Sequence, residues 1–225
     1  MFVTTTPQAI IDDVNMMTDG DGYNLVSAAQ FCARMNQELS SLWQWGRRAN
    51  RDAFTKVSDS LQMPAGANTM SMSAAAPAGA ALTDFSQPRG VDIMISSENW
   101  KKIRLWTFAA RDRIAVLAYR FMGDTITLLP SDIARQYPFR VWYMSSYPAV
   151  SATALSTAFS IPDGADEYVK QGMAALVRQR QDDDPSPHLQ AQARSRLDLE
   201  AFLATGKGDQ GAIADVSDEV GPELW

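Results

Sequence analysis

The side chains that could catalyse a reaction or bind a metal are few and lie far apart in this 225-residue chain. The chain has one histidine, His188, and one cysteine, Cys32. One residue of each type cannot complete the histidine and cysteine ligand sets of zinc sites, and a single cysteine cannot form a disulfide within the chain. Catalysis by a serine, a histidine and an acid would have to use His188. We therefore expect no zinc centre and no disulfide framework.

Carboxylates are more numerous, but their spacing indicates no catalytic or metal-binding group. The run Asp19-Gly20-Asp21-Gly22 is similar to the start of a calcium-binding loop, yet the twelfth position holds Gln30, where such a loop needs a glutamate. A cell-wall hydrolase needs two carboxylates held across a cleft, and it stays the weaker alternative function. The sequence predicts that the protein is not an enzyme and has no cofactor. The isolated carboxylates are Glu38, Glu98 and Glu167, and the run Asp182-Asp183-Asp184 is typical of an exposed loop.

Basic side chains gather in two stretches of the chain. The first holds Arg47, Arg48, Arg51 and Lys56, and cations near the C-terminus of a helix are favoured by the helix dipole alone. The second holds Lys101, Lys102, Arg104, Arg111, Arg113 and Arg120, opposed only by Asp112. The formal net charge of −6 argues against general nucleic-acid binding, and salt bridges to acidic parts of a neighbouring copy would also explain the second stretch. A nucleic-acid-binding or regulatory adaptor, with a DNA affinity that falls steeply with salt, is the alternative function.

Apolar residues at steps of three and four predict the helices. After Pro7, a typical first-turn residue, they predict a short helix that ends before the Asp19 turn. The clearest helix is predicted over 24–48, with Asn24 as its N-cap and Cys32 on its buried stripe. Two more helices are predicted over 163–181 and 187–204, separated by the three aspartates and by Pro185, which cannot continue a helix.

Between these helices, alternating apolar and polar residues predict a small β module over about 66–148. The alternation is clearest at Val91–Ile95, Thr125–Leu129 and Phe139–Met144. The last two strands are predicted to pair as a hairpin through Ser131–Pro138, and Ser97–Trp100 could open a further helix. The expected fold class is α+β but mainly α: a helical bundle with a small antiparallel β module and an extended C-terminal tail.

The chain is predicted to hold a single domain over 1–204, followed by an extended tail over 205–225. The tail has five acidic residues and one lysine, yet it ends in Leu224 and Trp225. An aromatic side chain at the tip of a polar segment is typical of a peptide that docks into another subunit. No stretch approaches the about 18 apolar residues of a membrane span, and the first residues do not resemble a secretory signal, so we expect a soluble protein.

Several short motifs follow one another between Tyr23 and Leu203. They include a strand that ends in proline, a Pro-Ala-Val-Ser turn, and the sequence Ile-Pro-Asp-Gly-Ala-Asp-Glu-Tyr at the start of the 163–181 helix. Together with the long helix before them, they resemble tailed-bacteriophage head-to-tail connectors, which are also called adaptor, gatekeeper or tail tubular A proteins. The sequence departs from the family pattern at Ala81–Asp84, where the family has Leu-Pro before the acid. The matching residues are Gly123, Leu128, Pro130, Tyr143, Pro148, Ser151, Pro162, Asp163, Asp166, Tyr168, Gly172, Ala174 and Ala175.

The resemblance implies a structural protein of the virion, made in the host cytoplasm and located at the head-to-tail interface. It implies a dodecameric ring between the portal and a tail or nozzle protein, which extends the DNA channel and offers a platform for tail attachment. Double-stranded DNA would pass through without sequence-specific binding, and no membrane or cofactor would be involved. The residues expected at the portal are Pro222, Leu224 and Trp225. The residues expected at subunit or channel contacts are Arg47, Arg48, Arg51, Lys101, Lys102 and Arg104.

Overall fold

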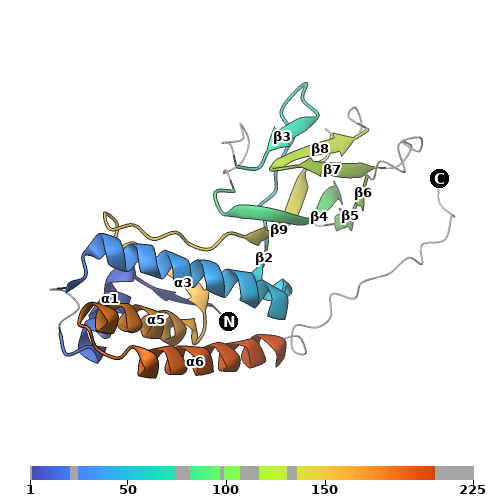
Figure 1. Cartoon of the computed structure of the whole chain (residues 1–225). Coiled ribbons are helices and arrows are strands. Elements are labelled where there is room, and N and C mark those ends of the chain that lie inside the picture. Colours follow the sequence, from blue (N-terminus) through green and yellow to red (C-terminus); the bar gives the residue numbers. More distant parts are fainter. Residues whose placement is uncertain are drawn as a thin grey trace. The chain divides into compact units, whose positions relative to one another are not determined.

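The chain divides into two compact units, which we describe separately. The structure is a computed structural model that describes residues 2–20, 25–73, 82–96, 99–106, 117–130 and 136–205. The helical unit comprises Met1–Ala53 and Pro148–Trp225, and the β unit comprises Phe54–Tyr147. In Figure 1 the helical unit combines the blue start of the chain with its orange-to-red end. The β unit is therefore an insertion between the two halves of the helical unit, and it contains nearly all of the module predicted over 66–148.

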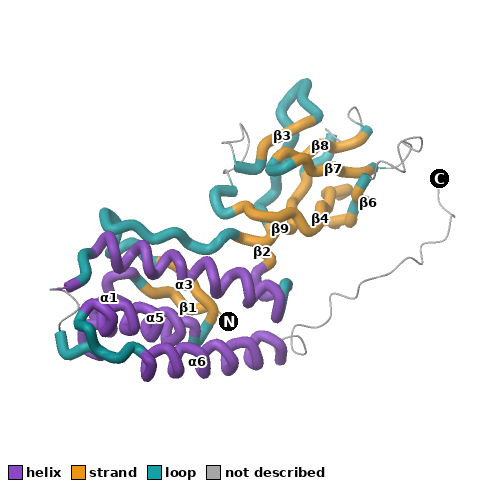
Figure 2. The backbone as a smooth tube through the Cα atoms, in the orientation of Figure 1, coloured by secondary structure: helices purple, strands orange, loops and turns teal. Residues whose placement is uncertain are grey.

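Four helices and a two-stranded sheet form the described part of the helical unit (Figure 2). The helices are α1 (Pro7–Met17), α3 (Ala28–Ala49), α5 (Ala165–Arg180) and α6 (Ser186–Thr205). Strand β1 (Phe2–Thr5) pairs antiparallel with β10 (Phe159–Pro162). The first strand of the chain is therefore held against the segment that leads into α5, a pairing that the sequence did not predict.

Local capping chemistry sets where these helices begin. The hydroxyl of Thr6 accepts a hydrogen bond from the first turn of α1, and a proline occupies the first position of that helix. Helix α3 begins with a capping box between Ser27 and Gln30, so its N-cap is Ser27 and not Asn24 as predicted. Helix α5 begins after Gly164, whose φ of 79° lies in the left-handed region that favours glycine.

Helix α5 lies at the centre of the helical unit, because it contacts α1, α3 and α6. Val169, Met173 and Val177 repeat at steps of four residues along α5 and are fully buried. Burying a side chain of this size contributes about 1.5–3 kcal/mol. Small residues such as Ala174 and Gly172 lie between them and let the neighbouring helices approach closely. The opposing core residues of α3 include Met35, Leu39 and Leu42.

Two four-stranded sheets form the described part of the β unit. The first has the order β2 (Thr55–Val57), β9 (Phe139–Ser145), β4 (Phe85–Ser96) and β5 (Asn99–Lys102). The second has the order β3 (Thr69–Ser71), β8 (Thr125–Leu129), β7 (Ala118–Met122) and β6 (Arg104–Leu105). Neighbouring strands are antiparallel except for the short β6 and β7 pair. A 3-10 turn, η1 (Asp52–Phe54), precedes β2.

The two sheets share one apolar core. Val91 and Ile93 of β4, together with Phe139 and Val141 of β9, supply it from the first sheet. Residues of β8 such as Ile126 supply it from the second. Because strand side chains alternate between faces, the residues between these positions lie on the opposite face of the first sheet.

The predicted hairpin between the 125–129 and 139–144 strands is wrong. Strand β8 pairs with β3 and β7, and β9 pairs with β2 and β4, so the two strands belong to different sheets. Each strand finds partners that are distant in sequence, and an alternating pattern does not reveal which partner a strand will take. The helix that Ser97–Trp100 could have opened does not extend over Asn99–Lys102, which forms β5 against β4.

The predicted fold class needs the same correction. The protein is a sheet-rich α+β fold with three sheets, and its described residues form only four α-helices, so it is not a mainly α helical bundle. The physical reason lies in Phe54–Tyr147, where short strands separated by polar and proline-rich segments bury their apolar residues between sheets. Such short strands give a weak sequence signal, because each one becomes stable only when several others pair with it.

Candidate functional site

The outward face of the first sheet carries a cluster of aromatic and charged side chains that contact one another. The guanidinium of Arg140 on β9 lies 4.6 Å from the ring centroid of Trp100 and 5.3 Å from that of Trp142. Asp92 Oδ2 accepts hydrogen bonds from Arg140 Nε (2.9 Å) and from Trp142 Nε1 (2.7 Å). Strand register places Asp92 of β4 directly opposite Arg140 and, on its other side, Lys102. We call Trp100, Arg140, Trp142 and Asp92 the tryptophan–arginine cluster.

This cluster fixes its side chains but leaves little free positive charge. Asp92 is only 9% exposed, so its ion pair with Arg140 is partly shielded from water. Each cation–π contact adds about 0.5–1 kcal/mol at such a site. Because Asp92 neutralises Arg140, the cluster is a poor site for anions. Its contacts instead order the sheet surface beside β5.

Next to the cluster lies the stretch that we call the basic edge: Lys101, Lys102, Arg104 and Leu105. Strand β5 is the last strand of the first sheet, and β6 is the last strand of the second. The three cations are exposed, and Leu105 is 56% exposed. Lysines on edge strands discourage pairing with foreign strands, which is a sufficient structural reason for part of this charge. The edge also places three predicted site residues side by side, in a form that a partner can contact.

The other cations of the second stretch contribute differently. Arg120 on β7 lies over the ring of Trp106, 5.3 Å from its centroid. Arg111 and Arg113 lie outside the described residues. Arg120 is therefore held against an aromatic ring in the same sheet as β6.

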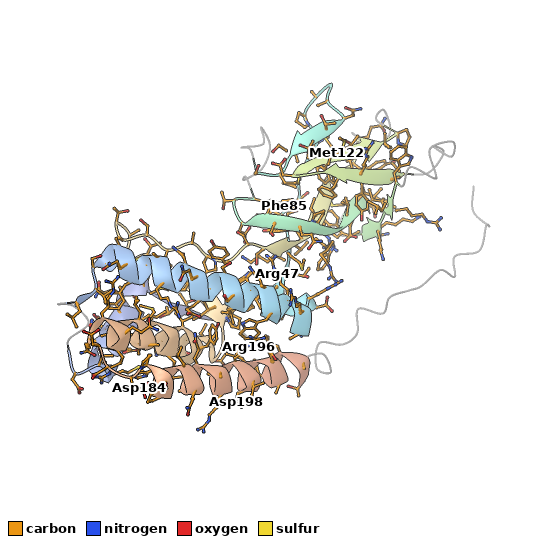
Figure 3. The ribbon with its side chains drawn as sticks, in the orientation of Figure 1. Arg47, Phe85, Met122, Asp184, Arg196 and Asp198 are labelled. Carbon is orange, nitrogen blue, oxygen red and sulfur yellow. The ribbon has the colours of Figure 1, made fainter. Side chains whose placement is uncertain are left out.

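The first basic stretch lies in the helical unit, at the C-terminal end of α3. Arg47 and Arg48 occupy the last turn of α3, where Figure 3 labels Arg47, and Arg51 follows the helix. Their position complements the partial negative charge of the helix C-terminus. Arg48 is exposed, whereas partial burial lowers the pKa of Arg47. Lys56 belongs to the β unit instead and pairs with Asp84 at 2.6 Å.

A groove of about 780 Å³ runs between the start of α5 and the length of α6. We call it the acidic groove. Its apolar lining includes Ala191, Leu199 and Phe202, and its single cation is Arg194. Three carboxylates line it, from Asp163, Glu167 and Asp198, the last of which Figure 3 labels on α6. The sequence did not single out this groove, because its sides come from two helices whose relative placement is set by packing.

Two of the predicted carboxylates lie in the helical unit, in different surroundings. The Glu38 side chain is 7% exposed, pairs with Arg34 Nη2 at 2.7 Å and accepts a hydrogen bond from Gln192 Nε2 at 2.7 Å. Burial and the neighbouring Glu38 raise the pKa of Tyr168 to about 12. Glu167 is exposed and accepts a hydrogen bond from Gln171. Glu98 lies outside the described residues.

The remaining candidates for chemistry have structural partners. His188 Nδ1 lies 2.7 Å from Gln171 Oε1, and burial with the charge of Arg178 lowers the pKa of this imidazole. Cys32 is buried, which raises the pKa of its thiol. Asp183 pairs with Arg178 at 3.2 Å. Among the residues that the structure describes, no group of three or more histidine, cysteine, aspartate and glutamate side chains could hold a metal ion.

Other predictions have limited or no structural counterpart. Asp19 lies in a turn with a φ of 60°, and its carboxylate pairs with Arg178 at 3.3 Å. Pro222, Leu224 and Trp225 lie outside the described residues, as does the whole tail from 206 onwards. Within the described ranges, no helix is long and apolar enough to cross a membrane.

The sequence did not predict the tryptophan–arginine cluster, although a signal was present. Arg140 and Trp142 occupy the polar positions of the predicted 139–144 strand, and Asp92 occupies a polar position of the predicted 91–95 strand. Only the register between strands shows that these positions face one another.

Comparison with protein-family models finds no match for the chain, and comparison with curated proteins finds none either.

Proposed function

We propose that the protein is a structural subunit of a tailed-phage head-to-tail connector. In this proposal, copies of the chain form a ring, dodecameric by the resemblance, between the portal and a tail or nozzle protein. The ring extends the channel through which double-stranded DNA passes and offers a platform for the tail. The protein acts in the virion and catalyses no reaction.

The observation that carries this proposal is the pair of exposed leucines on helix α6. Leu199 and Leu203 are buried in the helical unit. Leu189 and Leu197 on the same helix are 40% and 64% exposed. A helix that only covers a core needs one buried apolar stripe. Further exposed leucines on such a helix are typical of a surface that another protein covers.

The resemblance supports the choice of a head-to-tail connector as the assembly. Several of its motif residues lie at junctions between elements. Gly123 has a φ of 63°, which favours glycine, at the turn between β7 and β8. Pro162 ends β10, and Asp166 lies in the first turn of α5. These positions support the alignment of the motifs with real structural junctions.

The test is the mass of the assembly formed by the purified chain with and without the cognate portal ring, measured by mass photometry. We expect a complex of fixed stoichiometry on the portal. A chain that stays monomeric and does not bind the portal at concentrations well above micromolar would refute the proposal.

A chain that lacks Leu224 and Trp225 should keep its circular dichroism spectrum and bind the portal more weakly. Equal binding would exclude the tail tip as a portal anchor.

Substitutions on α6 test the observation itself. Leu189→Ser with Leu197→Ser removes two exposed leucines, so we expect little loss of stability but a strong loss of assembly on the portal. The matched control is Met16→Ser with Leu25→Ser, which also removes two exposed apolar side chains from the helical unit. Equal assembly of both double variants would remove the support that α6 lends to the proposal.

A nucleic-acid-binding adaptor is the second candidate, and the exposed cations of the basic edge favour it. A protein that neutralises several phosphates loses DNA affinity steeply as salt rises. Fluorescence anisotropy with a 20-base-pair duplex between about 50 and 200 mM salt separates the two readings. A connector subunit should bind free duplex weakly at both concentrations.

A further inference from the structure

We propose that the acidic groove of one copy binds the basic edge of a second copy. The inference rests on the proposed function, because it names the surfaces through which neighbouring subunits of the ring meet. The groove belongs to the helical unit and the edge to the β unit, so each copy offers one surface of each kind. A contact between two different surfaces repeats from copy to copy and closes into a ring when the rotation permits.

The groove combines apolar surface with negative charge. Phe202 is 46% exposed and lines the groove together with Leu199, so a partner side chain can bury apolar area there. Asp163 and Asp198 are exposed, and with Glu167 they supply three negative charges against the one positive charge of Arg194. The groove therefore favours a segment that is both basic and apolar.

The basic edge has the complementary composition. From Asn99 to Leu105 the chain carries three cations and no acid, and it ends in an exposed leucine. Among the residues that the structure describes, both of its strands are the last in their sheets, so no described strand of the same sheet pairs with their outer sides. Trp100 of β5 belongs to the tryptophan–arginine cluster, and its contact with Arg140 of β9 holds β5 in place. The backbone of the edge is therefore already ordered, so that little conformational entropy is lost when it binds.

The two surfaces also match in length. Residues 187–202 of α6 line the groove and span about 22 Å at 1.5 Å per helical residue. The seven residues from Asn99 to Leu105 reach about 20 Å when extended. An extended segment of this length can therefore lie along the groove, and because successive strand residues point to opposite sides, Arg104 can face its acidic side while Leu105 faces its apolar lining.

Charge favours a second copy over other occupants of the groove. The three carboxylates repel nucleic acid, and they also repel the chain's own tail, in which five acids outweigh one lysine. The basic edge of another copy brings the exposed cations Lys101 and Arg104, whereas Lys102 lies opposite Asp92 within its own sheet. Opposite charges on two surfaces steer association and reject wrong partners, even where each exposed pair contributes little energy.

Charge exchange between the two surfaces tests the contact. The groove variant is Asp163→Lys with Asp198→Lys, and the edge variant is Lys101→Glu with Arg104→Glu. All four residues are exposed, so circular dichroism and thermal unfolding should show intact folds. Each variant alone should weaken self-association about tenfold, measured by sedimentation velocity. The control is Arg89→Glu with Arg180→Glu, which changes the net charge as the edge variant does but at exposed positions outside both surfaces.

Rescue separates a direct contact from a general effect of charge. An equimolar mixture of the groove and edge variants restores opposite charges at every junction when the two alternate. A chain that carries all four substitutions restores them in every copy. We expect both to recover wild-type association, and the control variant to associate as the wild type does. Failure of the fourfold variant to recover, or wild-type association of the groove and edge variants, would overturn the inference.

The outcomes for this inference and for the connector proposal are distinguishable. A wild-type chain that binds the portal while the charge variants assemble normally refutes only the groove contact. A chain that self-associates with the expected rescue but ignores the portal refutes only the connector. A chain that does neither refutes both. If the edge variant loses affinity for a 20-base-pair duplex while its association is unchanged, the edge is a nucleic-acid site and the groove contact is overturned.

Discussion

Glu38 is a buried carboxylate at the meeting point of three helices. It extends from α3, pairs with Arg34 of the same helix and accepts a hydrogen bond from Gln192 of α6. Its charge also contributes to the raised pKa of Tyr168 on α5. Removing one member of a buried pair leaves its partners without compensation, which costs more than the pair itself contributes. The sequence named Glu38 only as an isolated carboxylate, and in the structure it links α3 to α6.

Substitution of Glu38 should therefore be far more costly than substitution of an exposed glutamate with the same spacing. We expect Glu38→Ala to lower the free energy of unfolding by about 3 kcal/mol. The matched control is Glu200→Ala, which removes the partner of Arg196 in an exposed i, i+4 pair and should cost about 0.5 kcal/mol. Urea unfolding measures both. Similar costs for the two variants would contradict the structural role of Glu38.

Gly172 is restricted by the same cluster. A Cβ atom built on Gly172 would lie 2.6 Å from Glu38 Oε1 and would also clash with Gln192 Nε2. Alanine normally stabilises a helix interior by about 1 kcal/mol relative to glycine. Here the gain is outweighed, because both contacted groups are hydrogen-bonded to each other and cannot move without breaking that bond.

We expect Gly172→Ala to lower the free energy of unfolding by about 1–2 kcal/mol in spite of its helix propensity. Gly90→Ala is the matched control, since nothing lies within 4 Å of a Cβ at that position and its φ is not positive. Thermal unfolding of the two variants compares them directly. A stabilised Gly172→Ala protein would show that the cluster relaxes freely.

At the scale of elements, a lysine joins the first helix of the chain to the central one. Lys170 Nζ on α5 lies 2.8 Å from Asp13 of α1 and 2.8 Å from Asp166 of its own helix. Burial opposes the charged forms, but the hydrogen bond and charge of Lys170 outweigh it and lower the pKa of Asp166 below 3.8. Burial alone would also lower the pKa of Lys170, yet the two aspartates raise it.

The pH dependence of this junction follows from the lowered pKa of Asp166 and the raised pKa of Lys170. A carboxyl whose pKa is lower in the folded state contributes stability above pH 3.8, and that contribution is lost as pH falls through the folded pKa. A lysine whose pKa is raised contributes stability that is lost only as pH rises through its folded pKa. We therefore expect Lys170→Met to be less stable than wild type at pH 7, with a difference that shrinks below about pH 3.8.

Urea unfolding at pH 7 and pH 3 measures that difference. The control is Lys56→Met, which removes an exposed ion pair in the β unit and should cost about 0.5 kcal/mol at pH 7. A Lys170→Met deficit that is the same at both pH values would mean that the junction is stabilised by packing of the lysine stem instead of by charge.

At the scale of the whole molecule, the chain has two apolar cores. One is centred on α3 and α5, and the other lies between the two sheets of the β unit. Leu39 belongs to the first and Ile126 to the second, and both are fully buried. A large-to-small change in a core costs the transfer energy of the lost atoms and an additional term for the cavity.

Each core should respond to its own substitution. We expect Leu39→Ala and Ile126→Ala each to cost about 2–5 kcal/mol. Hydrogen exchange followed by mass spectrometry should show faster exchange mainly in the unit that holds the substituted residue. Uniform acceleration across Met1–Ala53 and Phe54–Tyr147 by either variant would indicate that the chain unfolds as one cooperative unit.

The sequence predicted the two helices that form the acidic groove, but it predicted neither the strands of the basic edge nor the two surfaces themselves. Lys101, Lys102 and Arg104 were singled out by their charge, and the structure adds that they lie on edge strands. Arg140 and Asp92 were not singled out, because an ion pair between strands depends on register. The acidic groove was not predicted either, since Asp163 and Asp198 are 35 positions apart and only the packing of α5 against α6 brings them to one groove.

What the sequence determined by itself is the set of features that depend on neighbours within a few residues. The helix after Pro7, the helix stop at Pro185 and the alternation of the 139–144 strand all follow from local backbone and capping preferences. The tertiary structure alone decided that β8 and β9 belong to different sheets and that the fold is rich in sheet. The physical reason is that strand partners are chosen by contacts between distant residues, whereas a helix satisfies its backbone hydrogen bonds within its own segment.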